Sequence, residues 1–197
     1  MTEKVLILVP VFHSLADLGS VGEQVEQQRA ASGGDAVVQA QEARVEQLWD
    51  GIEQALMSVI RFTGVPMHQV RVYQDGLPVC GQERAIVDDV AAQGSRNYRL
   101  VAQLANDGAQ LMGTESPELL KRELALHQST GGATAAGAAL ADEAAALLRE
   151  RDAFIARRIE ATLQAGEIGV LFMGLSHDVP AHLGEEIHVR HLFKVDG

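Results

Sequence analysis

Residues 5–11 read VLILVPV, an unbroken run of β-branched residues, leucine and one proline that contains no polar side chain. Such a run is typical of a strand that is buried on both faces, as in the interior of a parallel sheet. A second run of the same character, IGVLFM, occupies residues 168–173. These two stretches predict that the core of the protein is a sheet with both faces covered.

The sequence between and after these runs alternates between helical and extended patterns. Apolar residues recur at helical spacing in several segments, which predicts helices over residues 41–62, 83–93, 97–106, 117–127 and 140–163. Further strands are predicted over 68–73, 109–113 and 187–193, with a short helix over 179–183. The alternation favours an α/β fold with a mostly parallel sheet flanked by helices, and no repeat or sharp boundary divides residues 1–197 into two domains.

Two segments lack a sustained apolar stripe. Residues 20–41 are rich in Gln, Glu, Gly and Ala, and residues 128–138 are rich in Gly, Ala and Thr. We expect both segments to be flexible or to depend on a partner for their order.

Composition and charge limit the classes of partner. The chain has 16 basic and 27 acidic residues, a net charge of −11, and no stripe of Lys and Arg that could face a phosphate backbone. Nucleic-acid binding is therefore not expected. The lone Cys80 cannot form an internal disulfide, the apolar run near Val5 is too short for a signal segment, and no stretch is long enough to span a bilayer, so a cytoplasmic protein without membrane contact is expected.

Ionisable residues follow the predicted strands at corresponding places. His13 follows the first strand, Glu115 follows the strand 109–113, and His177 follows the strand 168–173. Asp75 follows the strand 68–73 and is a weaker fourth candidate. Ligands of open parallel sheets bind beyond the carboxyl ends of the strands, so these side chains are expected to gather at one edge.

Two histidines and two carboxylates at one edge can hold a divalent metal ion or divide the roles of general acid and base. Neutral histidine with carboxylate favours Zn, Mn or Co over Mg. The competing interpretation is structural, because a polar residue after a strand often only caps a turn, and Asp178 can serve as the N-cap of the helix 179–183.

Arg151 belongs to the charged run Arg149-Glu150-Arg151-Asp152, which would ordinarily be a solvated helix face. It lies three or four residues from Leu147, Leu148, Phe154 and Ile155, and so falls on the apolar stripe of its helix. A buried arginine needs a carboxylate partner, and Glu115 is the expected one.

The segment from Arg151 to His177 resembles the closing part of the TraB/GumN/Tiki and erythromycin-esterase-like superfamily, in which an Arg-led helix precedes a buried strand ending in Gly-x-x-His. The resemblance covers about the last quarter of the chain. It implies a site built from His13, Glu115 and His177 with Arg151 in support, and for some members metal-dependent hydrolysis. The motifs YQDGLP at 73–78 and GTESPELL at 113–120 also resemble an uncharacterised prokaryotic family.

Three functions remain open from the sequence. The first is a hydrolase that acts on a small substrate with a metal ion or a His/Glu pair, with His13, Glu115, His177 and Arg151 as its catalytic residues. The second is a non-catalytic binding or regulatory protein that recognises a small ligand at the same edge. The third is an interaction protein, including a homo-oligomer, that pairs through the acidic helical segments 20–61 and 138–165.

Overall fold

The computed structural model describes residues 3–11, 35–129 and 137–193. Five parallel strands form one sheet in the order β3-β2-β4-β1-β5. Their bounds are β1 Lys4–Val11, β2 Val70–Gln74, β3 Gln110–Met112, β4 Ile168–Gly174 and β5 Ile187–His191. The predicted α/β fold with a mostly parallel sheet is confirmed.

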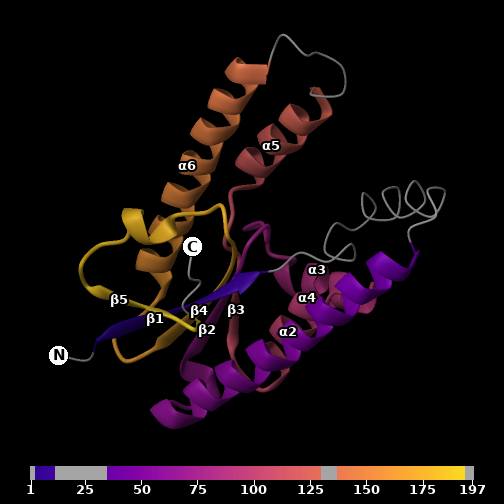
Figure 1. Ribbon diagram of the computed structural model, residues 1–197. Helices are drawn as coiled ribbons and strands as arrows, with labels where there is room; N and C mark the ends of the chain where they lie inside the picture. Colours follow the sequence, from indigo (N-terminus) through magenta and orange to yellow (C-terminus); the bar gives the residue numbers. More distant parts are fainter. Residues whose placement is uncertain (1–2, 12–34, 130–136, 194–197) are drawn as a thin grey trace.

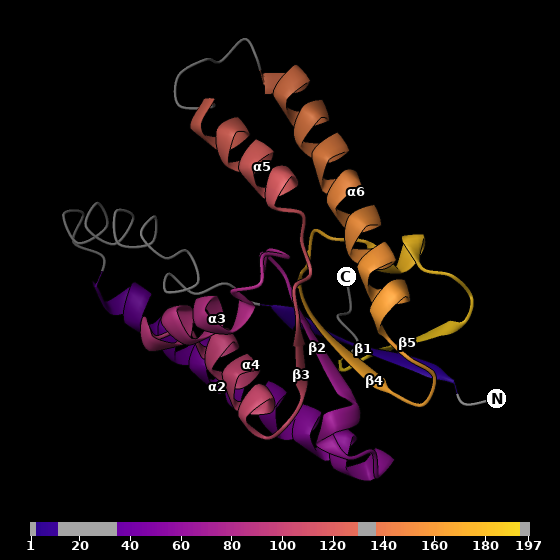
Figure 2. The same cartoon turned by 180° about the vertical axis from the view of Figure 1, so that it is seen from behind.

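Helices cover both faces of the sheet (Figures 1 and 2). The face of Val70 and Val72 packs against α2 and α4, and the face of Leu6 and Tyr73 packs against α6. The helical elements are α2 Asp35–Thr63, η2 Met67–Gln69, α3 Glu83–Ala92, α4 Arg96–Asn106, α5 Pro117–Ser129, α6 Gly137–Thr162 and η3 Val179–His182. In both views α2, α3 and α4 lie on one side of the sheet and α6 lies on the other.

Strand β4 lies at the centre of the sheet, and all seven of its residues are buried. It pairs with β1 on one side, from Val5↔Ile168 to Val11↔Gly174, and with β2 on the other, from Val70↔Ile168 to Gln74↔Phe172. The three strands therefore end close together, and the residues that follow them share one edge of the sheet.

Helices α5 and α6 pack side by side and project beyond this edge (Figure 1). Helix α6 precedes β4 and runs back along it, so Arg151, eleven residues before Thr162, lies about 16 Å from the helix end. The seven residues of β4 span about 23 Å, so Arg151 is placed toward the carboxyl end of the sheet. Because α6 extends beyond the strands, its middle lies at the carboxyl ends of the strands.

Three helix boundaries differ from the prediction by more than one residue. Helix α2 begins at Asp35, six residues before the predicted start at residue 41. Helix α5 extends to Ser129, two residues beyond its predicted end, and α6 begins at Gly137, three residues before its predicted start. Alanine-rich sequence has high helix propensity and continues a helix without an apolar stripe. Of the segments 20–41 and 128–138 that the sequence predicts to be flexible, residues 20–34 and 130–136 lie outside the described residues.

Within the described ranges, none of the helices combines the length and apolar composition needed to cross a bilayer.

Candidate functional site

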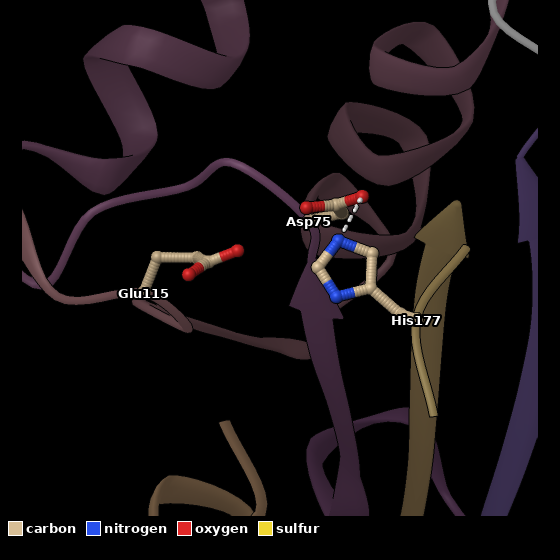
Figure 3. A group of neighbouring side chains, drawn as sticks. All are labelled: Asp75, Glu115 and His177. Carbon is tan, nitrogen blue, oxygen red and sulfur yellow. Dashed lines mark ion pairs between the residues drawn. The ribbon is translucent and has the colours of Figure 1, made fainter. Parts of the chain in front are cut away.

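Three side chains from three strand ends converge at the carboxyl edge of the sheet. Asp75 follows β2 directly, Glu115 lies three residues after β3, and His177 lies three residues after β4. One carboxylate oxygen each of Asp75 and Glu115 and one ring nitrogen of His177 lie within 4.8 Å of one another (Figure 3). Asp75, the weaker candidate of the sequence, belongs to the group, and its Oδ2 lies 3.5 Å from Nε2 of His177.

The backbone fixes the position of Asp75. Its N–H donates to the carbonyl of Phe172 at 2.9 Å, which ties the end of β2 to β4. Its Oδ2 accepts the N–H of Gly174 at 3.2 Å, so the carboxylate also caps the end of β4. Asp75 is therefore oriented by the strand that carries His177.

Backbone hydrogen bonds to the loop at residues 77–79 hold Glu115 in position. The N–H groups of Thr114 and Glu115 both donate to the carbonyl of Leu77 at 2.9 Å, and the N–H of Val79 donates to the carbonyl of Glu115 at 2.9 Å. The next residue, Ser116, starts α5 by accepting the N–H of Leu119. The loop is fixed at both ends, and the Glu115 side chain has no exposed surface.

Arg151 binds three carboxylates. Its Nη2 and Nε donate to the two oxygens of Glu115 at 2.5 and 3.2 Å, and Nη2 also donates to Oδ1 of Asp75 at 3.0 Å. Its Nη1 donates to Glu123 of α5. The expected pairing of a buried Arg151 with Glu115 is confirmed, and it joins the strand ends to the projecting helices.

His177 is oriented by Asp152, a residue that the sequence interpretation did not include. Nδ1 of His177 contacts Oδ1 of Asp152, and Oδ2 of Asp152 accepts the N–H of Asp178 at 2.9 Å. An ionised carboxylate only accepts hydrogen bonds, so Nδ1 carries the proton and the lone pair of a neutral ring lies on Nε2. Nε2 is the nitrogen that faces Asp75.

Nε2 of His177 and Oδ2 of Asp75 are 3.5 Å apart, which is long for a direct hydrogen bond. Two ligands bound to one ion at 2.0–2.1 Å with a tetrahedral angle lie about 3.3–3.4 Å apart. A histidine that binds a metal usually donates its other N–H to a carboxylate, as His177 does to Asp152. The spacing of His177 and Asp75 therefore matches that of two metal ligands, and together with Glu115 they could hold a divalent ion.

The pKa values reflect burial and charge pairing. Burial raises the pKa of Glu115; Arg151 opposes this and Asp75 adds to it, so the pKa lies above its ordinary value. Burial lowers the pKa of Arg151, but its carboxylate partners outweigh this effect and raise it. Arg151 therefore stays cationic, while Glu115 takes up a proton more readily than an ordinary glutamate does.

The pKa values of His177 and Asp152 are shifted in opposite directions. Burial alone would lower the pKa of His177, but the hydrogen bond to Asp152 and the charge of Asp75 outweigh it, and the pKa is raised. Burial would raise the pKa of Asp152, but the hydrogen bonds from His177 and from the Asp178 backbone lower it. Asp152 therefore remains ionised and holds the ring in place.

The other candidates are placed as follows. His13 lies outside the described residues. Asp178 stands at the N-cap of η3 but makes no capping hydrogen bond with its side chain. The remaining described histidines are outside the group: His127 contacts the carbonyl of Glu123, and His188 lies 3.9 Å from Glu3.

A cavity of about 460 Å³ lies elsewhere, at the amino end of β4. Its walls are mainly apolar and include Val5, Ile7, Val59 and Ile168. It shares no residue with the group at the strand ends.

No family model, curated protein or solved structure matches the chain. The assignment of a function therefore depends on the geometry of the site.

Proposed function

We propose that Asp75, Glu115 and His177 bind a divalent metal ion and that the protein is a metal-dependent hydrolase of a small substrate. The observation that carries this proposal is the convergence of the three donor atoms within 4.8 Å, with Asp152 behind His177. His13 is proposed as a further ligand because it follows β1, the other neighbour of β4. The resemblance to the TraB/GumN/Tiki and erythromycin-esterase-like superfamily supports the same reaction class.

The donor set of one imidazole and two carboxylates suits Zn, Mn or Co. When bound, such an ion supplies Lewis acidity and lowers the pKa of a coordinated water toward neutrality. The residues of the chain have separate tasks. Asp152 fixes the tautomer of His177, and Arg151 fixes the carboxylates of Glu115 and Asp75.

Arg151 is compatible with this proposal. A carboxylate offers about four lone-pair sites, and the guanidinium occupies one on each oxygen of Glu115 and one on Asp75. The backbone N–H groups of Gly76 and Gly174 occupy one further site on Glu115 and one on Asp75. About one lone pair of Glu115 and two of Asp75 then remain for an ion. Arg151 also offsets part of the repulsion between the two carboxylates, which would otherwise oppose their common ionisation.

The second candidate function requires no reaction at the same network. Glu115 is fully buried and Arg151 is 5% exposed, and each already has a charged partner. Such a network also fits a non-catalytic protein that binds a small ligand. Metal-free acid–base chemistry by His177 and Glu115 is the corresponding alternative for an enzyme.

Metal titration separates these functions. The chain is stripped with a chelator, dialysed and titrated with Zn, Co and Mn, and bound metal is measured by elemental analysis. We expect one ion per chain, with at least about tenfold weaker binding in His177→Ala and Asp75→Asn. The controls are His188→Ala and Asp88→Asn, which change an exposed histidine and an exposed carboxylate outside the site.

Hydrolysis is then measured on ester and amide substrates with the loaded and the stripped protein. Activity that returns with the metal supports the hydrolase. Metal binding without hydrolysis supports the binding protein, and activity without any bound metal supports the His/Glu alternative. The metal site is contradicted if the wild type takes up no ion, so that it does not differ from His177→Ala.

A further inference from the structure

The carboxylates of the site outnumber its cations. Glu115, Asp75 and Glu123 surround Arg151, and Asp152 adds a fourth carboxylate next to His177. With His177 neutral, as a metal ligand must be, and the four carboxylates ionised, one guanidinium leaves three negative charges, and a divalent ion would still leave one. The loaded site is therefore negative, whereas sites for phosphate or carboxylate substrates present free cations.

Arg151 is not available to a substrate anion. Its Nε, Nη1 and Nη2 all donate to carboxylates, and its side chain is 6% exposed. The neighbouring guanidinium groups are also engaged: Arg122 binds Glu150, and Arg158 donates to the carbonyl of Gly113. Among the residues that the structure describes, an anionic substrate would therefore meet repulsion without a guanidinium that is free of other partners in this network.

Glu123 is the carboxylate that a ligand can reach. The exposed fractions of the side chains are 0% for Glu115, 4% for Asp152, 11% for Asp75 and 33% for Glu123. Glu123 lies on α5, and only its Oε1 is bound by Arg151. It therefore places a negative charge at the solvent-facing side of the network.

We infer that the loaded site selects cationic over neutral and neutral over anionic carbonyl substrates, and that Glu123 is the residue that determines this preference. The inference rests on the proposed function, since it assigns a substrate class to the same site. A cationic group on the substrate would lie near Glu123 while its carbonyl lies at the ion. A phosphoester or a substrate with a free carboxylate would be disfavoured.

Three hydroxamates with the same metal-binding group test the preference. The cobalt-loaded full chain is titrated with β-alanine hydroxamate, butyrohydroxamate and succinic monohydroxamate, which are cationic, neutral and anionic, and binding is measured from the visible absorption of cobalt. We expect β-alanine hydroxamate to bind about tenfold more tightly than succinic monohydroxamate at low salt. The ratio should decrease at about 0.5 M salt because ions screen the charges.

Variants then locate the source of the preference. Glu123→Gln should reduce the ratio at least threefold, and Glu150→Gln should leave it unchanged, because Glu150 makes the adjacent ion pair of the same two helices without touching the site. The inference is overturned if succinic monohydroxamate binds as tightly as β-alanine hydroxamate or more tightly. If the ratio of the two affinities is unchanged in Glu123→Gln, Glu123 does not determine the preference. If no cobalt is taken up, the proposed function fails and the inference with it, whereas cobalt uptake with an anion preference overturns the inference alone.

Discussion

Arg151 lies where water is almost excluded, and the surrounding carboxylates allow it to keep its charge there. Its hydrogen bonds to Glu115 and Asp75 are made below the surface, and the bond to Glu123 is made at the rim. Moving a charge out of water costs several kcal/mol, which only close partners offset. The dependence is mutual, because Glu115 is fully buried and has Arg151 as its compensating cation.

We expect Arg151→Ala to lower the free energy of unfolding by about 3 kcal/mol or more at about pH 8, because Glu115 is left ionised and unpaired. The loss should be smaller at about pH 5. Burial already raises the pKa of Glu115, and removing Arg151 raises it further, so the carboxyl takes up a proton as the pH falls and the cost of its charge disappears. Urea unfolding of the chelator-treated proteins at both pH values measures the difference.

The matched control for this substitution is Arg122→Ala. Arg122 makes the neighbouring pair with Glu150 between the same helices, but both side chains are about half exposed. Exposed pairs contribute little to stability, so this variant should unfold like the wild type. Equal stability of Arg151→Ala and the wild type at both pH values would show that the buried pair does not stabilise the fold.

For Arg151 and Asp152, the spacing from apolar residues of the same helix predicts whether the side chain is buried. The apolar stripe of the helix placed Arg151 inside the protein, and the same rule applies to Asp152, which is three residues before Ile155 and four before Ala156, both buried. That signal could have identified Asp152. Glu123 offered no such signal, because its partner lies on another helix and only the packing of α5 on α6 brings the two together.

Among the elements, the loop from Gly113 to Ser116 connects the fold most directly to the site. It follows the edge strand β3, makes a bridge between Glu115 and Pro78, and leads into α5. Gly113 is required by the close approach of the loop 77–80, because an added Cβ would lie 2.8 Å from Cα of Val79 and 3.0 Å from the carbonyl oxygen of Pro78. Backbone atoms cannot move away as a flexible side chain can.

Gly113→Ala should therefore displace the loop and, with it, Glu115. We expect a loss of about 1–3 kcal/mol in the free energy of unfolding and about tenfold or more weaker metal binding. Chemical unfolding and metal titration measure the two effects. Gly51→Ala is the control, since a Cβ at Gly51 meets no atom within 4 Å and alanine favours a helix. Unchanged metal affinity in Gly113→Ala would show that the loop does not position Glu115.

The elements themselves were largely predictable, because their signals are local. The run 168–173 and the cap Ser116-Pro117 predicted the first residues of β4 and α5, and the predicted ends lie within one or two residues of those observed. The predicted starts of two helices were late, by six residues at residues 35–40, DAVVQA, and by three at residues 137–139, where the sequence shows no sustained apolar spacing. Periodicity detects helices through the surface they bury, so a segment that helix propensity alone extends is missed.

At the scale of the molecule, the order of the strands determines which residues meet. The absence of polar alternation predicted a parallel sheet, but the order β3-β2-β4-β1-β5 depends on packing between elements distant in sequence. This order brings Asp75, Glu115 and His177 together although about a hundred residues separate the first from the last. The sequence therefore predicted the edge of the sheet and the kind of residues, but it gave Asp75 less weight than Glu115 and His177.

The same order leads to a test of His13. β1 lies beside β4, and its last residue, Val11, pairs with Gly174, whose N–H binds Asp75. His13 follows Val11 by two residues in the sequence, so it remains a predicted ligand at the edge where the three strands end. We expect His13→Ala to weaken metal binding by about tenfold or more without a large change in stability, as measured by metal titration and urea unfolding. His188→Ala, an exposed histidine on β5, is the control; if the two variants bind metal equally well, the ion is held by Asp75, Glu115 and His177 without His13.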